Sequence, residues 1–148
     1  MVWGCIDMQE KSDLVFIQGN ITAAMYIDQV INPEVVPLFV RRPHMVYMQD
    51  NARPHAARIT TAHLMNMGIA VLPWPSKSPD LNPIEHLWDE LERRVRDRPH
   101  QPTSLQQLRQ ALQEEWDAIP RDVWRHLIGS MRRRCLAVVD ADGGHTRY

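Results

Sequence analysis

Residues 76–96 read SKSPDLNPIEHLWDELERRVR and mark the change from a proline-rich connection to a long helix. Apolar side chains recur at the spacing of one buried helix face, at Ile84, Leu87, Trp88, Leu91 and Val95. Pro83 suits the first turn of a helix, where its missing N–H has no intrahelical partner in any case. The stretch therefore predicts an amphipathic helix that begins at Pro83 and covers another layer of the fold.

Glu85, in the first turn of this helix, has two interpretations. With Asn82 as N-cap and Pro83 at the first helical position, Glu85 falls on the third position of a capping box. An acid there also interacts favourably with the helix dipole, by about 0.3–1 kcal/mol. The alternative is that the carboxylate holds a metal ion. Taken alone, the local sequence favours the cap.

A strand, a helix and a second strand are predicted just before this stretch. HMVYMQD (44–50) is a nearly continuous apolar run ending in an acid, which is typical of a strand buried on both faces. The following helix has Ala57, Thr61, Leu64 and Met65 at helical spacing and Gly68 just past its end. IAVLPW (69–74) predicts the second strand. A strand–helix–strand unit of this length favours parallel strands joined by a right-handed crossover.

The flanking regions predict a strand pair and several helices. MVWGCI (1–6) and DLVFIQG (13–19) are short strand-like runs. A helix follows Thr22, its expected cap residue, with Pro33 and Pro37 limiting its C-terminal end. Two further helices are predicted over 103–119 and from Pro120 to 139. In the first of these, the residues expected to face inward are Leu105, Leu108, Leu112, Trp116 and Ile119. The order predicts an α/β fold with a C-terminal helical layer.

Composition narrows the function classes. The chain has 148 residues, which suits one domain, and a formal net charge of −1, so no overall positive field indicates a nucleic-acid partner. Cys5 and Cys135 lie far apart and suggest neither a zinc site nor a disulfide framework. No leader-like segment opens the chain, and no apolar run is long enough for a membrane span, so we expect an intracellular protein.

Asp50 is the second candidate metal ligand. It ends the first strand of the predicted parallel pair, and reactive groups in open α/β sheets gather beyond the carboxyl ends of strands. Glu85 starts the helix after the neighbouring strand, so both carboxylates are expected at one edge of the sheet. Carboxylates together with water and substrate phosphate suit Mg²⁺, which could support phosphodiester chemistry. The alternative is that Asp50 serves the turn DNARP through local hydrogen bonds.

VYMQDNARPHAA (46–57), followed by VLPWPSKSPDLNPIEHLWDELERRVR (71–96), resembles the catalytic domain of DDE transposases of the Tc/mariner superfamily. The likeness extends over residues 1–138, with 139–148 expected to be a flexible tail. It implies a ribonuclease H-like mixed sheet and assigns Asp50 and Glu85, which are separated by 34 residues, to the second and third places of the metal-binding triad. It also implies a Mg²⁺ or Mn²⁺ cofactor, DNA cleavage and transfer, transposon-end and target DNA as partners, and a nuclear location.

The resemblance also implies an incomplete site. The family's first catalytic Asp lies on the central first strand of the sheet, before the segment that MVWGCI matches, and neither Asp7 nor Asp13 takes its place. The family's helix-turn-helix region is likewise not matched. We therefore expect impaired catalysis, and open sheet edges that favour low stability or self-association. The alternative function is an inactive DNA-binding or protein-interaction module.

Four residues are candidate nucleic-acid contacts: His55, Trp74, Lys77 and Arg93. His55 could meet a phosphate or assist proton transfer, or could simply be a solvent-facing helix start. Trp74 and Lys77 could flank DNA, or belong to a rigid turn. Arg93, Arg94, Arg96 and Arg98 alternate with acids, which favours a salt-bridged helix face. The run Arg132–Arg134 is less diluted by acids and is the better phosphate or nuclear-import candidate.

Overall fold

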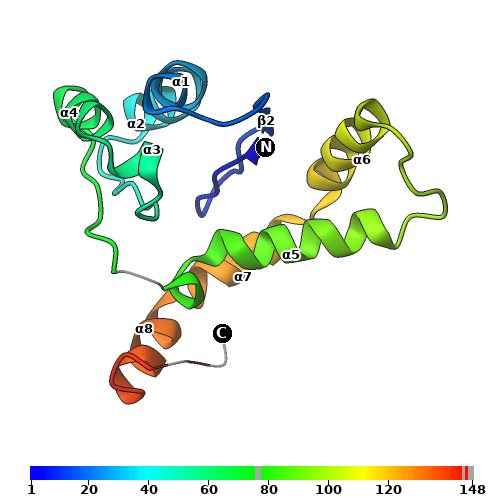
Figure 1. The fold of residues 1–148 in the computed structure, drawn as a ribbon. Coiled ribbons are helices and arrows are strands. Elements are labelled where there is room, and N and C mark those ends of the chain that lie inside the picture. Colours follow the sequence, from blue (N-terminus) through cyan, green and yellow to red (C-terminus); the bar gives the residue numbers. More distant parts are fainter. Residues whose placement is uncertain (76–77, 145, 147–148) are drawn as a thin grey trace. The chain divides into compact units, whose positions relative to one another are not determined.

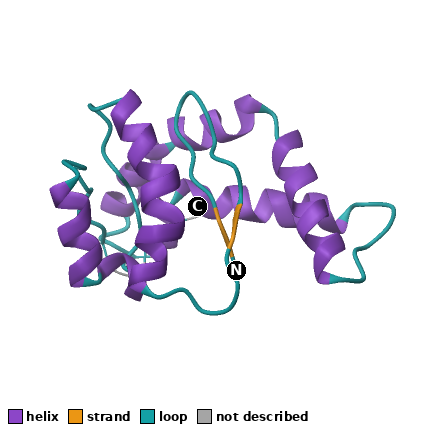
Figure 2. Cartoon of the chain, turned by 90° about the horizontal axis from the view of Figure 1, so that it is seen from above, coloured by secondary structure: helices purple, strands orange, loops and turns teal. Residues whose placement is uncertain are grey.

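The structure is a computed structural model and describes residues 1–75, 78–144 and 146. It divides into two compact units, each of which is treated by itself (Figure 1). The first unit comprises Met1–Trp3 and Val15–Lys77, and the second comprises Gly4–Leu14 and Ser78–Tyr148. Helices and loops predominate, and within the described residues the paired strands are β1 (Val2–Trp3) and β2 (Val15–Phe16) (Figure 2).

The N-terminal strand pair forms as predicted, although both strands are short. β1 and β2 are antiparallel, with Val2 opposite Phe16 and Trp3 opposite Val15. The amide of Ile17 donates to the carbonyl of Met1 at 2.9 Å and extends the pairing by one bond.

A continuous helical segment follows, and it does not end at the prolines. α1 (Ala23–Tyr26) begins at Thr22, whose side chain accepts a hydrogen bond from the amide of Met25, as the cap prediction requires. It continues through the π-helix η1 (Ile27–Val35) into α2 (Val36–Arg41), with Pro33 inside the π segment. The amide of Val36 donates to the carbonyl of Ile31, five residues back. This wider winding accommodates a proline ring that would meet the i−4 carbonyl of an α-helix, so the predicted C-terminal limit was wrong.

The two strands predicted after this helix are reduced to one parallel bridge, between Tyr47 and Val71. Tyr47 donates to the carbonyl of Ala70 and accepts from the amide of Leu72, both at 2.8 Å, so the predicted parallel direction is confirmed. The expectation of a strand buried on both faces was wrong, since Val46 is 57% exposed. The ladder does not extend backwards, because the amide of Met45 donates to the carbonyl of Arg42 in a turn.

The intervening helix is broken into α3 (Arg53–Ala56) and α4 (Arg58–Asn66), with Ala57 extended between them. The hydroxyl of Thr60 donates to the carbonyl of Pro54 at 2.7 Å and satisfies it across the break. The buried positions of α4 are therefore Thr60 and Leu64. Of the positions predicted to face inward, only Leu64 is buried, while Ala57 is half-buried and Thr61 and Met65 are exposed. Gly68, with φ of +70°, follows the helix end as predicted.

One apolar core holds the first unit together. Tyr26, Val30 and Ile31 from the helical segment are fully buried, and Leu64 of α4 packs in the same cluster. The rest of the cluster comprises Ile17, Val35, Tyr47 and Ile69. Residues from both sides of the Tyr47–Val71 bridge thus share one core, which fixes the segment leading to Asp50.

The second unit is helical and includes the N-terminal loop. The 3₁₀ turn η2 (Pro79–Leu81) leads into α5 (Pro83–Arg96), whose predicted apolar face is confirmed, with Leu87, Leu91 and Val95 buried. α6 (Leu105–Ala118) buries Ala111 and Trp116, but Leu105 is 86% exposed and Leu108 is also exposed, so these two inward assignments were wrong. The last predicted helix divides at Ser130 into α7 (Arg121–Gly129) and α8 (Met131–Asp140).

The predicted inward positions toward the C-terminal end of the 103–119 helix, Leu112, Trp116 and Ile119, are half-buried or buried. Trp116 stacks on Trp88 of α5 at 5.1 Å, and Ile119 is 2% exposed. Among the residues that the structure describes, no helix has the length and apolar character needed to cross a membrane.

Candidate active site

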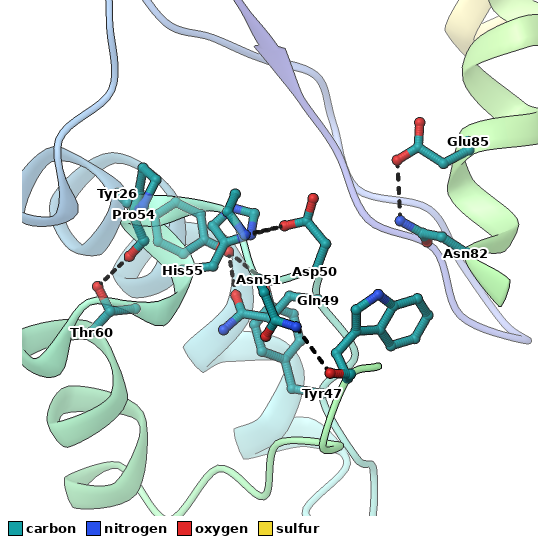
Figure 3. A network of polar contacts seen from close by, with 12 residues as sticks. Tyr26, Tyr47, Gln49, Asp50, Asn51, Pro54, His55, Thr60, Asn82 and Glu85 are labelled. Atoms are coloured by element: carbon teal, nitrogen blue, oxygen red, sulfur yellow. Dashed lines mark hydrogen bonds and ion pairs between the residues drawn. The ribbon is translucent and has the colours of Figure 1, made fainter. Parts of the chain in front are cut away.

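The carboxylate of Asp50 is held by two hydrogen bonds to one of its oxygens. Oδ1 accepts from the backbone amide of Ala52 at 3.0 Å and lies 2.6 Å from Nδ1 of His55 (Figure 3). The first bond is the turn interaction considered for DNARP, and the second comes from the first turn of α3. The Asp50 side chain is 48% exposed, so the carboxylate is oriented on one side and open to solvent.

A buried polar network lies behind His55. The ring of His55 packs on Tyr26 with a centroid separation of 4.5 Å. The hydroxyl of Tyr26 lies 2.8 Å from that of Tyr47 and donates to Oε1 of Gln49 at 2.9 Å (Figure 3). The segment of Tyr47 and Gln49, which leads to Asp50, is thereby tied to the helix that supports the imidazole. His55 is thus not a free solvent-facing residue.

Asn51 links the Asp50 segment to the loop after the second predicted strand. Its Nδ2 donates to the carbonyl of Trp74 at 2.9 Å. Trp74 is half-buried, and its backbone carbonyl is the acceptor of this bond. Lys77 lies outside the described residues.

Glu85 occupies the predicted place at the start of α5, but a full capping box is not formed. Asn82 is the N-cap residue, yet its side chain accepts no helix amide. Nδ2 of Asn82 instead donates to Oε1 of Glu85 at 3.2 Å, and the Glu85 amide donates to the carbonyl of Asn82 at 3.2 Å. The Glu85 side chain is exposed.

Carboxylate oxygens are the donors that Mg²⁺ and Mn²⁺ accept, and such ions are often held by one or two carboxylates, water and substrate phosphate. Within residues 1–75, 78–144 and 146, no cluster of three or more His, Cys, Asp or Glu side chains could hold a metal ion. Asp50 in the first unit and Glu85 in the second each carry a carboxylate, the type of donor that these ions accept.

The arginines of α5 are paired with acids, as the salt-bridge interpretation predicted. Glu90 pairs with both Arg93 and Arg94, and Arg96 lies 2.6 Å from Glu92. Arg98 bonds to two glutamates of α6, Glu114 and Glu115. The hydrogen bond from Arg93 lowers the pKa of Glu90; partial burial opposes this shift, and the Arg94 bond reinforces it. The positive charge of Arg93 is thus largely offset within the helix.

Arg53 and Arg58, two arginines near Asp50 in sequence, were not selected from the sequence. They begin α3 and α4 and are exposed. Neither makes an ion pair with an acid among the described residues. The signal for them in the sequence is their position within and just after the DNARP turn.

The run Arg132–Arg134 does not form a uniform basic surface. Arg132 and Arg133 are exposed, but Arg134 is 3% exposed and bonds inside the second unit, so it is not available as a phosphate contact. One of its partners is His86, next to Glu85. Burial and then the charge of Arg134 lower the pKa of His86, and Asp89 opposes them. A neutral His86 can accept the arginine's hydrogen bond.

Comparisons with known proteins identify the family. Residues 1–109 match the family model described as DDE superfamily endonuclease. The Tc1 transposase of Caenorhabditis elegans is 37% identical over 150 residues, and the Tcb1 transposase of Caenorhabditis briggsae is 36% identical over 156 residues. Each alignment takes in 100% of this chain and 54% of the relative, so the chain spans about half the length of the curated relatives it matches.

Solved structures agree on the fold. The Mos1 transposase catalytic domain with Raltegravir and Mg has 25% sequence identity and a TM-score of 0.79, covering 99% of this chain and 75% of that one. The Mos1 paired-end complex with the left transposon end also has 25% identity, with a TM-score of 0.75, covering 92% of this chain and 40% of that one. The likeness establishes a partial ribonuclease H-like α/β fold. The chain belongs to the DDE superfamily endonucleases, as a transposase domain of the Tc/mariner type.

Proposed function

We propose that this domain takes part in metal-dependent cleavage and transfer of DNA strands, with Asp50 and Glu85 as ligands of Mg²⁺ or Mn²⁺. The observation that carries the proposal is the Asp50 carboxylate, which is fixed through Oδ1 by Ala52 and His55 and is otherwise open to solvent. A solved relative contains Mg, and another is a complex with a transposon end, which supports the same chemistry for this chain.

The metal ion, when bound, would polarise a phosphodiester and favour ionisation of the attacking hydroxyl. The chain's own residues prepare the site. Asp50 supplies one anionic ligand whose orientation is set before binding, because His55 and the backbone hold Oδ1. Glu85 supplies a second from the first turn of α5. Ligand groups held in advance lose less conformational entropy when the ion binds.

The DNA backbone, in this proposal, is met mainly by Arg53 and Arg58, with His55, Trp74 and Lys77 as further contacts. The two arginines are exposed and carry charges that the described acids do not pair. Arg93 contributes less, because it would have to exchange Glu90 for a phosphate. Neutralising phosphates releases counterions, so binding should weaken as the salt concentration rises.

Strand cleavage tests the catalytic proposal. The protein is incubated with supercoiled plasmid DNA and Mn²⁺, and nicking is compared among the wild type, Asp50→Asn and Glu85→Gln. Two controls match these changes on exposed positions outside the proposed site: Asp28→Asn in η1 and Glu92→Gln in α5. Loss of nicking in the first two variants alone supports the assignment. Nicking that survives both substitutions refutes it.

Because Asp7 and Asp13 do not match the first position of the triad, we expect residues 1–148 alone to cleave slowly. The second candidate function is a DNA-binding module without catalysis, favoured by the exposed arginines of α3 and α4. A salt-dependent mobility shift that Glu85→Gln leaves unchanged, with no nicking by the wild type, would select this candidate.

A further inference from the structure

Arg134, on α8, is a buried cation with a specific set of partners. Its Nε donates to the hydroxyl of Ser130 at 2.7 Å, four residues earlier. Its Nη1 donates to the backbone carbonyl of Asp80 at 2.7 Å and lies 2.8 Å from Nε2 of His86. A charged group is costly to bury unless its geometry and hydrogen bonds are good, so this arrangement restricts where its partners can lie.

The partners of Arg134 lie on either side of Glu85 in the chain. Asp80 belongs to η2, the turn that leads into α5, and His86 directly follows Glu85. A second bond holds the same turn, since the hydroxyl of Thr146 donates to Oδ2 of Asp80 at 2.9 Å. Residues of the C-terminal part of the second unit thus hydrogen-bond to the segment that contains Glu85, and the bonded residues are 48 to 66 positions apart in the sequence.

Local and long-range bonds both hold the start of α5. Within the turn, the amide of Asn82 donates to the carbonyl of Pro79 at 2.9 Å, and the amide of Leu81 donates to the carbonyl of Ser78 at 3.2 Å. Nδ2 of Asn82 donates to Glu85 at 3.2 Å, which is the long end of the usual range. The bonds from Arg134, at 2.7 and 2.8 Å, add a restraint from a distant part of the chain to this turn.

We propose that Arg134 is a positioning residue for Glu85, acting through the carbonyl of Asp80 and the ring of His86. The role of the positioned carboxylate rests on the function proposed above. Lysine cannot replace the arginine, because the planar guanidinium reaches Ser130 and the Asp80–His86 pair from different nitrogens, whereas an ammonium is a single compact donor.

The test compares Arg134→Lys with Arg133→Lys, a matched change at the exposed neighbouring position. Hydrogen exchange of backbone amides is measured over 81–87 and, as an internal reference, over α6. Mn²⁺ affinity is measured on the same full chain by the spectroscopic signal of the free ion. Arg134→Lys should accelerate exchange over 81–87 but not in α6, and should weaken Mn²⁺ binding by about 10-fold, as loss of a residue supporting a metal ligand typically does. Arg133→Lys should match the wild type.

Wild-type exchange over 81–87 in Arg134→Lys would overturn the proposal. If that variant does not fold, Ser130→Ala removes the acceptor of Nε together with the hydroxyl's own bond to the carbonyl of Leu127, and should produce a smaller change over 81–87. Equal changes in α6 would instead show a general role in stability and would also overturn the proposal. A wild-type chain that binds no Mn²⁺ would contradict the proposed function, whereas exchange over 81–87 would still decide whether Arg134 fixes this turn.

Discussion

Nδ1 of His55 lies 2.6 Å from Oδ1 of Asp50. The short helix α3, which follows the turn after Asp50, therefore places the imidazole of His55 against the Asp50 carboxylate. The imidazole is itself supported by Tyr26. In metal sites, a group that bonds to a ligand's side chain sets the orientation and the basicity of that ligand. His55 is placed to do this for Asp50.

Replacing His55 with Gln should weaken Mn²⁺ binding by roughly 10- to 100-fold, the usual effect of losing such a supporting group. The side chain at position 55 would then no longer hold Oδ1 from the same direction. Calorimetric titration with Mn²⁺ in the presence of duplex DNA measures the change. His63→Gln is the matched control, since His63 lies in α4 and bonds to Asn32. Equal affinities in the two variants would show that His55 does not support a ligand.

Removing both Arg53 and Arg58 should weaken DNA binding and lower the slope of log K against log salt by about 1 to 2, because each lost phosphate contact accounts for roughly 0.9 of slope. Arg93→Ala should change the slope less, since its charge is already met by Glu90. Fluorescence anisotropy with labelled duplex DNA across a salt series gives both slopes. A larger effect from Arg93 than from the double variant would reverse the proposed order of importance.

Tyr26→Phe should lower the free energy of unfolding by about 1–3 kcal/mol, because it removes a buried hydroxyl that contacts Tyr47 and Gln49. The phenyl ring remains beneath His55, so Mn²⁺ affinity should not change. Urea unfolding and a Mn²⁺ titration separate the two effects. Tyr26→Phe combined with Tyr47→Phe should cost less than the sum of the single changes, since the hydroxyls contact each other; additive costs would argue against coupling.

Local periodicity was sufficient for several elements. The apolar stripe of α5, the cap at Thr22 and the helix end at Gly68 depend on residues within a few positions of one another, and each agrees with the structure. The likeness of residues 46–57 and 71–96 to the transposase motifs was also sufficient to find the family. Features of this kind are encoded in short segments, so a single sequence reveals them.

Other features depend on contacts that periodicity does not contain. The first helix was predicted to end at its prolines because proline disrupts an α-helix. The structure instead has a π-helix around Pro33, which this rule does not cover. Helical spacing assigned Leu105 to the interior, but its side chain is 86% exposed. The sequence Arg132–Arg134 suggests three exposed cations, but Arg134 is buried and bonds to residues of η2 and α5.

The surroundings of Asp50 were predicted in the same uneven way. Asp50 and His55 are close in sequence, and the structure places them in contact. Tyr26 could not be assigned to the site, because it reaches His55 from a helix that precedes it by 29 residues. The positions of Arg53 and Arg58 are evident from the sequence, but only the structure shows that neither forms an ion pair with an acid among the described residues. The contacts of Asp50 with other elements therefore could not be predicted from the local motif.

Stability should depend on pH through Glu90. Its pKa in the folded protein lies below the ordinary value of 4.5, chiefly because of the Arg93 hydrogen bond, so its contribution is present above pH 4.5 and is lost as pH falls through the lowered value. Glu90→Gln should destabilise the protein by about 0.3–1 kcal/mol at neutral pH, and this difference should shrink as the pH falls below 4.5. Urea unfolding across a pH series measures the difference. A constant difference across this range would exclude the carboxylate as its source.

Gly4 is the point at which the N-terminal loop packs against the tryptophans of the second unit. A Cβ at this position would lie 3.1 Å from Cη2 of Trp88 and 3.2 Å from Cζ2 of Trp116. The Trp116 ring is held on the other side of the contact by its own hydrogen bond, from Nε1 to the carbonyl of Ser12 at 2.8 Å. The added methyl group therefore meets rigid aromatic carbons, and relief would require the loop or the stacked pair to move.

Gly4→Ala should consequently destabilise the protein by about 1–3 kcal/mol, the usual cost of overpacking. Gly129→Ala is the matched control: nothing lies within 4 Å of its added Cβ, and in α7 alanine should be neutral or stabilising by up to about 1 kcal/mol. Urea unfolding followed by tryptophan fluorescence compares the variants, and the near-ultraviolet circular dichroism of the stacked pair should change only in Gly4→Ala. Equal stability and unchanged dichroism in both variants would mean that the loop yields to the methyl group without disturbing Trp88 or Trp116.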